Sequence, residues 1–376
     1  MRQGPADFID YPPPVYIGTR GIPPMRKEAV LYEKLPGDKV RCTACARYCE
    51  LADGQVGLCG VRGNEAGKLD LYVYGKVVAG HTDPVEKKPV THYRPGTQVY
   101  SIATTGCNWL CRYCQNHDIS QRRKAEGRDM SPRQVVAEAL AQGADGIAYT
   151  YNQPSIFIEF ARDCGVEARR RGLFNVFVSN GYDTPETVSM MGEFLDCITV
   201  DFKGSAEPEF TKKYIGVPDP QPIFDTLRGI RDETSIHVEI TDLIIPGVGD
   251  SLEHAKKLCR FVLDELGPDV PVHFLRFHPD YKMMEFPPTP VETLVAHHRM
   301  AKEEGLRYAY IGNVPGHPLE DTYCHGCGEV AVKRNSFDIS SWNLDAQNRC
   351  RSCGCQVPIT GSPPPGYKKR WFHLLE

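Results

Sequence analysis

The segment from residue 99 to about residue 313 alternates short β-branched or apolar runs with amphipathic helical stretches. Repeated strand and helix units of this kind predict an α/β fold built on a parallel sheet. Six or more such units favour a sheet that curves into a full or partial barrel, with functional residues where the strands end. The predicted strands are 99–103, 146–151, 175–179, 197–202, 235–244, 271–276 and 307–311.

Helices are predicted between these strands, among them 131–142 and 251–266. Ser131 offers an N-cap hydroxyl, and Pro132 suits the first helical position because it lacks an N–H that would be unpaired there. Residues 1–40 are rich in proline and glycine and show no sustained periodicity. They are therefore predicted to form an N-terminal arm or irregular surface segment.

The chain has fifteen cysteines, no run of eighteen apolar residues and no start that resembles a signal peptide. We therefore expect a cytoplasmic protein without a membrane partner. Because the cytosol keeps thiols reduced, its clustered cysteines more often bind metal or do chemistry than form disulfides. The net charge of -4 gives no broad basic field, so a nucleic-acid partner is not expected. Cys164, Cys197 and Cys259 stand alone among apolar residues and are predicted to be small buried hydrophobes.

Cys107, Cys111 and Cys114 lie in residues 100–115, YSIATTGCNWLCRYCQ, directly after the first predicted barrel strand. The next cysteine in the sequence is Cys164, in a predicted helix. Structural zinc sites use four protein ligands and ferredoxin clusters recruit a fourth cysteine, so three thiolates indicate a metal with one open position. A zinc site completed by His117 or by a distant residue, or a set of redox thiols, is the alternative.

The pattern C-x3-C-x-aromatic-C, with Tyr113 before the last cysteine, resembles the hallmark of the radical S-adenosylmethionine (SAM) superfamily. The resemblance implies a partial (βα)6 TIM-like barrel and a 4Fe-4S cluster whose open iron binds the amino and carboxylate groups of SAM. It also implies reductive cleavage of SAM to a 5′-deoxyadenosyl radical, which abstracts hydrogen from a substrate. A reductant protein such as flavodoxin or ferredoxin is the partner that this chemistry implies.

The same resemblance implies further site residues at the ends of the following strands. Residues 150–154, TYNQP, match the position of the family's GGE-like motif, with Gln153 in place of the usual carboxylate. Asp201 and Lys203 share one face of a strand end and are expected to be catalytic, with a local ion pair as the alternative. The expected cofactor-binding residues are Tyr113, Asn152, Gln153, Ser179, Asn180, Asp201, Ile244 and Gly247.

A nearer resemblance is to pyruvate formate-lyase activating enzymes and, more closely, to the radical SAM enzyme of the AmmeMemoRadiSam system. It is carried by residues 83–89 (DPVEKKP), 106–108 (GCN), 114–116 (CQN) and 311–316 (IGNVPG). This likeness implies oxidoreductase-like chemistry of the activating-enzyme type.

Two further cysteine clusters flank the predicted barrel. Two C-x2-C pairs near the C-terminus are typical of a zinc ribbon, although an auxiliary iron-sulfur cluster is a rival. The four cysteines are Cys324, Cys327, Cys350 and Cys353, with Cys355 either spare or able to substitute for Cys353. The N-terminal cluster is less regular and predicts either zinc or a second iron-sulfur cluster at Cys42, Cys45, Cys49 and Cys59. The predicted domains are an arm (1–40), a cysteine-rich metal-binding domain (41–95), a barrel (96–316) and a zinc-ribbon-like domain with a tail (317–376).

Three functions compete. The first is a radical SAM enzyme that abstracts hydrogen from a small molecule, and the second is an activase that acts on a glycine of a glycyl-radical enzyme. A barrel mouth open to a protein loop would favour the activase, whereas a mouth covered by the N-terminal domain would favour a small substrate. The third is a metal-stabilised module that binds protein or nucleic acid without turnover, and it predicts no SAM cleavage.

Overall fold

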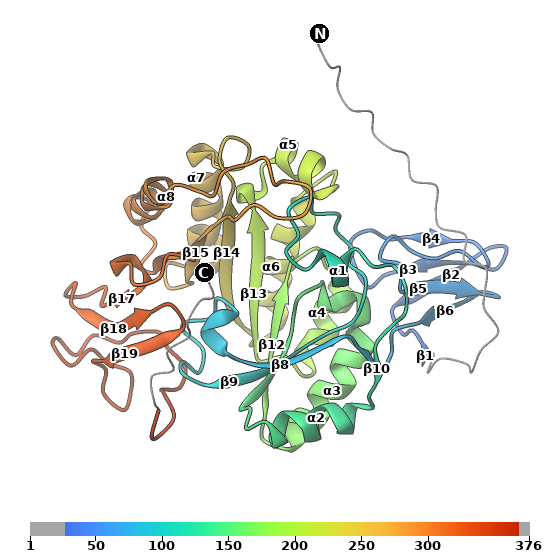
Figure 1. Ribbon diagram of the computed structural model, residues 1–376, viewed down its shortest axis with the longest axis horizontal. Helices are drawn as coiled ribbons and strands as arrows, with labels where there is room; N and C mark the ends of the chain where they lie inside the picture. Colours follow the sequence, from blue (N-terminus) through green and yellow to red (C-terminus); the bar gives the residue numbers. More distant parts are fainter. Residues whose placement is uncertain (1–26, 368–376) are drawn as a thin grey trace, which may run out of the picture.

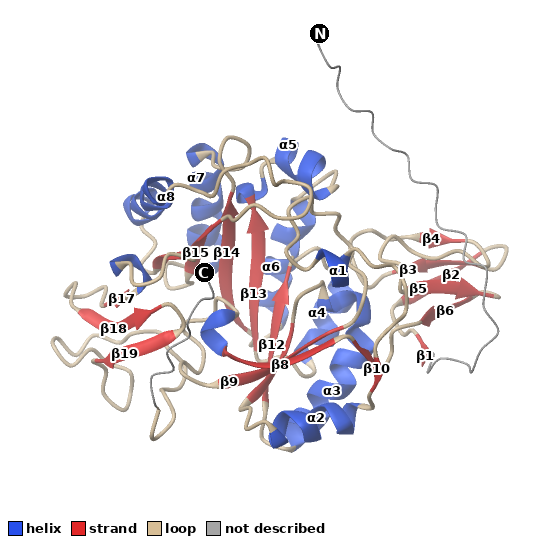
Figure 2. Ribbon diagram, in the orientation of Figure 1, coloured by secondary structure: helices blue, strands red, loops and turns tan. Residues whose placement is uncertain are grey.

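The computed structural model describes residues 27–367 and is built around one eight-stranded sheet (Figures 1 and 2). The strand order is β16-β15-β14-β13-β12-β11-β9-β8. All neighbours pair in parallel except β8, which pairs antiparallel with β9 at one edge. The strands are β8 (Ala79–Pro84), β9 (Gln98–Ala103), β11 (Gly146–Tyr149), β12 (Phe174–Ser179), β13 (Cys197–Lys203), β14 (His237–Ile244), β15 (Val272–Arg276) and β16 (Ala309–Gly312).

The sheet confirms the predicted mixed α/β fold with parallel strands, because each of the seven predicted strands is present within a few residues of its expected bounds. The apolar runs are long because the strands are buried on both faces, as is usual for parallel sheets. Within residues 27–367 no pairing joins β16 to β8, so the sheet does not close by hydrogen bonds into a full barrel.

Helices follow the strands, as the alternation predicts (Figure 2). Ser131 and Gln134 form a reciprocal capping box at the start of α2. The predicted helix at 251–266 is α7 followed by a π-helical turn, Val262–Leu266. The helices are α1 (His117–Ser120), α2 (Pro132–Ala141), α3 (Ile158–Arg170), α4 (Pro185–Gly192), α5 (Pro208–Phe210), α6 (Gln221–Glu233), α7 (Leu252–Phe261) and α8 (Val291–Glu304).

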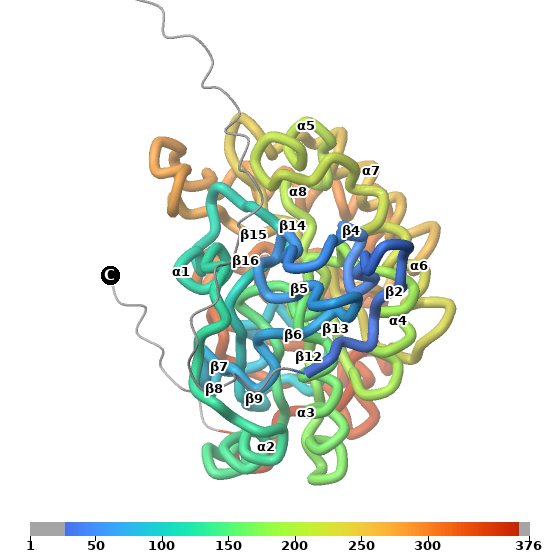
Figure 3. The backbone as a smooth tube through the Cα atoms, turned by 90° about the vertical axis from the view of Figure 1, so that its right-hand side faces the viewer, coloured from blue at the N-terminus to red at the C-terminus, as the bar shows by residue number. Residues whose placement is uncertain are grey.

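The N-terminal part forms two small antiparallel sheets that lie beside α3 and α4 (Figures 1 and 3). The Thr184 hydroxyl donates to the Thr43 carbonyl oxygen at 2.6 Å, and the Thr187 hydroxyl to that of Ala44 at 2.9 Å. The strands are β1 (Lys27–Glu28), β2 (Tyr32–Leu35), β3 (Lys39–Cys42), β4 (Glu50–Leu51), β5 (Arg62–Glu65) and β6 (Lys68–Leu71), while β7 (Lys76–Val77) pairs with β10 (Arg128–Asp129).

These sheets correct the prediction that residues 1–40 form an irregular arm, because β1, β2 and the start of β3 lie inside that range. The strands are short and mostly exposed or half-buried, so they lack the long apolar alternation that sequence patterns detect. Residues 1–26 of the predicted arm lie outside the described residues.

A third small sheet, made of β17 (Thr322–Tyr323), β18 (Val330–Asn335) and β19 (Asp338–Trp342), follows the last strand of the central sheet. It has a core of its own around Ala331, Val332 and Leu344. The lone cysteines Cys164, Cys197 and Cys259 are buried, as predicted. None of the helices within residues 27–367 is long and apolar enough to cross a lipid bilayer.

Candidate active site

The three central cysteines lie at the carboxyl ends of the parallel strands, in the loop that follows β9, and line a cavity of about 510 Å³. The ends of β11, β12 and β13 reach the same cavity. Seven of the predicted cofactor-binding or catalytic residues line it: Tyr113, Asn152, Gln153, Ser179, Asn180, Asp201 and Lys203. The structure thus brings together residues that the sequence places at four separate strand ends.

The cysteine loop is held from several sides. The Asn152 side-chain nitrogen donates to the carbonyl oxygens of Thr104 at 2.7 Å and Gly106 at 2.8 Å. On the other side, the backbone N–H of Leu110 donates to the Ile215 carbonyl oxygen at 2.9 Å. These bonds pair backbone groups that would otherwise be buried without partners, so the loop is fixed before any ligand binds.

The donor set of this loop fits a polynuclear cluster better than a single ion. A tetrahedral zinc ion holds thiolate sulfurs about 3.8 Å apart, since each Zn–S bond is about 2.3 Å. The three sulfurs are not among the groups, within residues 27–367, whose ligand atoms all lie within 4.8 Å of one another. Burial raises the pKa of Cys107 to about 11 and raises that of Cys111 well above its usual range, so bound metal is needed to keep these groups as thiolates.

Asn152, one of the residues that line the cavity, has a polar atom without a partner. The side-chain oxygen of Asn152 is buried and has no hydrogen-bond partner among the described residues. Buried amide oxygens are almost always paired in native proteins, and an exception calls for a specific explanation. A ligand that carries an N–H donor, such as the ammonium group of SAM, would provide the missing partner.

Gln153 lines the cavity and is also held by a network of hydrogen bonds within the chain. Its side-chain oxygen accepts from the Asn180 backbone N–H at 2.7 Å, and its nitrogen donates to Ser179 Oγ at 2.9 Å and Asp183 Oδ1 at 3.0 Å. Burial raises the pKa of Asp183 to about 6. Sequence reasoning missed Asp183, although it follows the end of β12 by four residues, where functional groups are expected.

Asp201 and Lys203 both line the cavity and form an ion pair, with Lys203 Nζ 2.9 Å from Asp201 Oδ2. Thr241 donates a hydrogen bond to the other carboxylate oxygen. Burial opposes the charge on Lys203, but Asp201 and the nearby sulfurs of Cys111 and Cys114 outweigh burial and raise its pKa. Lys203 is therefore a fixed positive charge beside the cysteine loop.

Ile244 and Gly247, the residues predicted from the β14 region, are not among the residues that line the cavity. Ile244 is fully buried, and its carbonyl oxygen accepts from Thr289 Oγ1 at 2.6 Å. Gly247 lies in a turn where its N–H donates to Asp250. Leu243 lines the cavity instead. Successive side chains of a strand point to opposite faces, so the side chains of Leu243 and Ile244 cannot both face the cavity.

Sequence reasoning also left the lysines of the 83–89 segment without a role, and the structure places Lys87 and Lys88 in the cavity wall. Their ammonium groups lie 2.8 Å from the two oxygens of the Asp83 carboxylate. Lys88 also lies over the Tyr151 ring, 5.0 Å from its centroid. Burial lowers the pKa of Lys88, and Asp83 partly offsets this effect.

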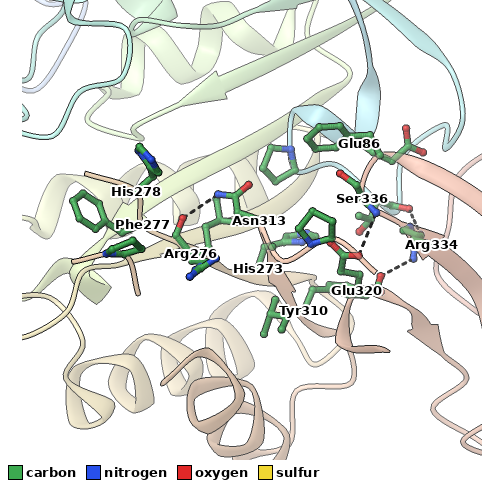
Figure 4. A pocket seen from close by; sticks show the side chains of 18 of the residues that line it. Glu86, His273, Arg276, Phe277, His278, Tyr310, Asn313, Glu320, Arg334 and Ser336 are labelled. Carbon is green, nitrogen blue, oxygen red and sulfur yellow. Dashed lines mark hydrogen bonds between the residues drawn. The ribbon is translucent and has the colours of Figure 1, made fainter. Parts of the chain in front are cut away.

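A second cavity of about 390 Å³ adjoins the first and shares Arg276, Phe277 and His278 with it (Figure 4). Its far wall comes from the third small sheet and the 84–91 segment. Glu86 and Arg334 are among the residues that line this cavity, and one polar atom of each, Glu86 Oε2 and Arg334 Nε, is buried without a hydrogen-bond partner among the described residues.

His273, in β15, is a satisfied structural residue. Its Nε2 lies 2.8 Å from Glu239 Oε2, although the ring also faces the second cavity. The Arg276 backbone carbonyl oxygen accepts from the Asn313 side chain at 3.1 Å. His278 lies in the wall common to both cavities.

The C-terminal cysteines form a site of a different kind. The sulfurs of Cys324, Cys327, Cys350 and Cys353 all lie within 4.8 Å of one another. Cys324 Sγ is 3.6 Å from Cys353 Sγ, and Cys327 Sγ is 3.8 Å from Cys350 Sγ, the spacing of ligands around one tetrahedral ion. The fifth thiol, Cys355, lies 3.3 Å from His325 Nε2 and is not part of this group.

The profile of the Radical SAM superfamily matches residues 101–262. The uncharacterized protein MJ0808 of Methanocaldococcus jannaschii is 43% identical over 336 residues, which cover 89% of this chain and 99% of that protein. The ribosomal RNA large subunit methyltransferase Cfr of Staphylococcus aureus is 22% identical over 211 residues, covering 50% of this chain and 57% of Cfr.

Two solved structures were also found to be similar. A radical SAM methyltransferase from Sphaerobacter thermophilus has a TM-score of 0.47 at 15% identity and covers 58% of this chain and 66% of its own. A domain of a pyruvate-formate lyase-activating enzyme from Bacteroides vulgatus has a TM-score of 0.39 at 19% identity and covers 45% of this chain and 100% of its own.

Proposed function

This chain belongs to the radical SAM superfamily, and from that premise we propose that it cleaves SAM reductively at a 4Fe-4S cluster held by Cys107, Cys111 and Cys114. When bound, the cluster and SAM together supply a 5′-deoxyadenosyl radical that abstracts hydrogen from a substrate. The observation that carries the proposal is that three thiols, and no fourth cysteine, line a cavity together with the ends of three neighbouring strands.

The residues of the chain have distinct tasks in this proposal. The unpaired oxygen of Asn152 accepts a hydrogen bond from the ammonium group of SAM, a role that the sequence suggested for Gln153. Ser179 and Asn180 face the ribose, and Leu243 offers apolar surface beside the adenine in place of Ile244. Lys203, held by Asp201, places a positive charge close to the cysteine sulfurs.

We infer that the substrate is a small polar molecule bound in the second cavity (Figure 4). Two features support a small substrate over the glycine loop of a partner enzyme. The cavity is walled on one side by the third small sheet and by the 84–91 segment, and its volume of about 390 Å³ suits a small molecule. Its unpaired Glu86 oxygen and Arg334 nitrogen suit one hydrogen-bond donor and one acceptor on a ligand.

The remaining assignments follow from the same proposal. The four C-terminal cysteines hold zinc, because their spacing matches a tetrahedral ion and zinc prefers four thiolates in structural sites. The central sheet is the partial barrel of the superfamily, open between β16 and β8. A flavodoxin or ferredoxin supplies electrons in the cytoplasm, and the proposed activity is of the kind that the resemblance to the AmmeMemoRadiSam system enzyme implies.

The proposal is tested by anaerobic reconstitution with iron and sulfide, followed by reduction with dithionite in the presence of SAM. Chromatography should detect 5′-deoxyadenosine with the native chain and none above background with Cys111→Ala. Cys355→Ser is the matched control, since its thiol is not part of a four-cysteine site, and it should match the native chain. Equal product from the native chain and Cys111→Ala would disprove the function.

A further inference from the structure

We propose that Cys42, Cys45, Cys49 and Cys59 hold a second iron-sulfur cluster, ligated entirely by this chain and packed against the loop that carries Cys107. The existence of this cluster does not depend on the proposed function; only its role as an electron carrier does.

The four cysteines converge although they come from different segments. Cys42 ends β3, Cys45 and Cys49 lie in the loop before β4, and Cys59 lies in the loop before β5. All four thiols are free and line one small hollow. The Cys42 N–H donates to the Cys49 carbonyl oxygen at 2.9 Å, which folds the loop back on itself. Four thiols around one hollow, with no disulfide among them, form a metal site.

The distances between these sulfurs distinguish an iron-sulfur cluster site from a zinc site. At the C-terminal site the same structure places four sulfurs within 4.8 Å of one another, at separations as short as 3.6 Å. No three of the N-terminal sulfurs meet that 4.8 Å limit within residues 27–367. Thiolates that bind different irons of one cluster stand further apart than thiolates on one ion, so the wider ring fits a cluster.

Most of the residues that line the hollow are buried. Three of the four cysteines are less than 9% exposed, and Arg62, which is 1% exposed, lines the hollow. The Arg62 guanidinium pairs with the buried carboxylate of Glu159 on α3. Burial and nearby charge both influence the reduction potential of an iron-sulfur cluster. The surroundings of this site would therefore affect the potential of a cluster bound there.

The N-terminal site touches the Cys107 loop directly. Asn108, the neighbour of Cys107, lines the N-terminal hollow. Arg47 donates to the Asn108 carbonyl oxygen at 3.0 Å and to that of Gly216 at 2.7 Å, which anchors the loop between Cys45 and Cys49. The Cys59 carbonyl oxygen packs so closely on Gly106 that no side chain would fit there. Backbone contact therefore links the two groups of cysteines.

A cluster with four protein thiolates has no open position for a substrate, so electron transfer is the role that its chemistry allows. One electron from a one-electron reductant, such as a flavodoxin or ferredoxin, would reduce this cluster and then pass to the metal at the Cys107 loop. The N-terminal cluster would return to its oxidised state, and no bond is made or broken in the relay.

The test uses the full chain with Cys107, Cys111 and Cys114 all changed to alanine, purified and reconstituted without air. We expect this variant to retain iron and acid-labile sulfide, and to give an electron paramagnetic resonance signal after dithionite reduction. The reciprocal variant, with Cys42, Cys45, Cys49 and Cys59 all changed to serine, should retain iron at the other site. Zinc without iron in the alanine variant, or no metal at all in a variant whose circular dichroism is native, would overturn the proposal.

The native holoprotein gives a measurement that does not depend on the folding of a variant. Two reduced clusters in contact through the backbone should broaden each other's resonance, and added SAM should change one of the two signals. A single, unbroadened signal that SAM changes completely would reject the second cluster. If the alanine variant holds a cluster while the native chain makes no 5′-deoxyadenosine, the proposed function fails and this inference stands.

Discussion

The side-chain nitrogen of Asn152 donates a hydrogen bond of 2.8 Å to the carbonyl oxygen of Gly106. This bond ties the end of β11 to the residue that precedes Cys107, and a second bond from the same nitrogen reaches Thr104. The other end of the amide is left unpaired in the cavity. One side chain thus positions the cysteine loop, and in the proposed function its unpaired oxygen would accept a hydrogen bond from SAM.

Asn152→Ala should lower both stability and SAM affinity. Two buried carbonyl oxygens lose their donor, and a buried group without a partner costs about 1–3 kcal/mol. Urea denaturation of the reconstituted protein should show the lower free energy of unfolding. An equilibrium binding measurement should show a lower affinity for SAM. Asn152→Asp should weaken the loop as well, because a carboxylate cannot donate to either carbonyl. Unchanged stability in both variants would contradict the positioning role.

Gly106→Ala should be far more damaging than an alanine at another left-handed glycine. Gly106 has φ +88°, and a Cβ there would overlap the Cys59 carbonyl oxygen and lie 2.8 Å from Val61 Cγ1. Gly143 has φ +69° with nothing within 4 Å, so Gly143→Ala bears only the backbone strain, about 1–2 kcal/mol. The iron content after reconstitution should be lower in Gly106→Ala and unchanged in Gly143→Ala. Equal iron contents in the two variants would argue against the close contact between Gly106 and the Cys59 carbonyl oxygen.

Glu159→Gln should destabilise the chain by about 3–5 kcal/mol, because it leaves the buried Arg62 charge without a counter-ion. Both side chains of this pair are at most 2% exposed. Arg122 and Glu126 form an exposed pair, so Glu126→Gln should change stability by less than about 0.5 kcal/mol. The denaturation midpoints of the two variants measure the difference in lost stability. Similar midpoints would show that the Arg62–Glu159 pair contributes no more to stability than an exposed ion pair.

Stability should decrease as the pH rises from about 4.5 to about 7, because the Glu86 carboxyl group loses its proton over this range. Burial raises the pKa of Glu86 from 4.5 to about 7. The folded state therefore holds this proton more tightly than the unfolded chain, so the stabilisation is complete below pH 4.5 and is lost as the pH rises through about 7. The loss is about 3 kcal/mol. Urea denaturation at pH 5 and pH 8 should show it in the native chain and not in Glu86→Gln; equal pH dependence would refute it.

Cys353→Ser should lose the C-terminal metal, whereas Cys355→Ser should keep it. The Cys353 sulfur is one of four that share a tetrahedral spacing, and the Cys355 sulfur contacts His325 instead. Elemental analysis of protein purified without air should find one zinc fewer per chain in Cys353→Ser. Removal of zinc by a chelator should also unfold the third small sheet, since its own apolar core is small. Zinc loss in Cys355→Ser would reassign the ligands.

Much of the fold follows from the sequence because its signals are local. The seven parallel strands and the capped start of α2 are encoded by apolar runs and by Ser131, which act over a few residues. The N-terminal strands β1 and β2 escaped prediction because short, exposed strands carry no such pattern. The sequence pointed to Ile244 as a cavity residue, whereas the structure places Leu243 in the cavity wall, and the reason for this difference is another one. A parallel strand is apolar on both faces, so its pattern does not say which residue faces the cavity.

By itself the sequence determined the parallel α/β sheet, three groups of cysteines and the position of the Cys107 group at a strand end, because periodicity and ligand spacing are local properties of a chain. Only the tertiary structure decided which groups meet across long separations: Cys59 against Gly106, and Glu86 and Arg334 around one cavity. It also decided that the C-terminal sulfurs are compact while the N-terminal ones are spread. Such distances depend on how whole elements pack, and no short stretch of sequence encodes them.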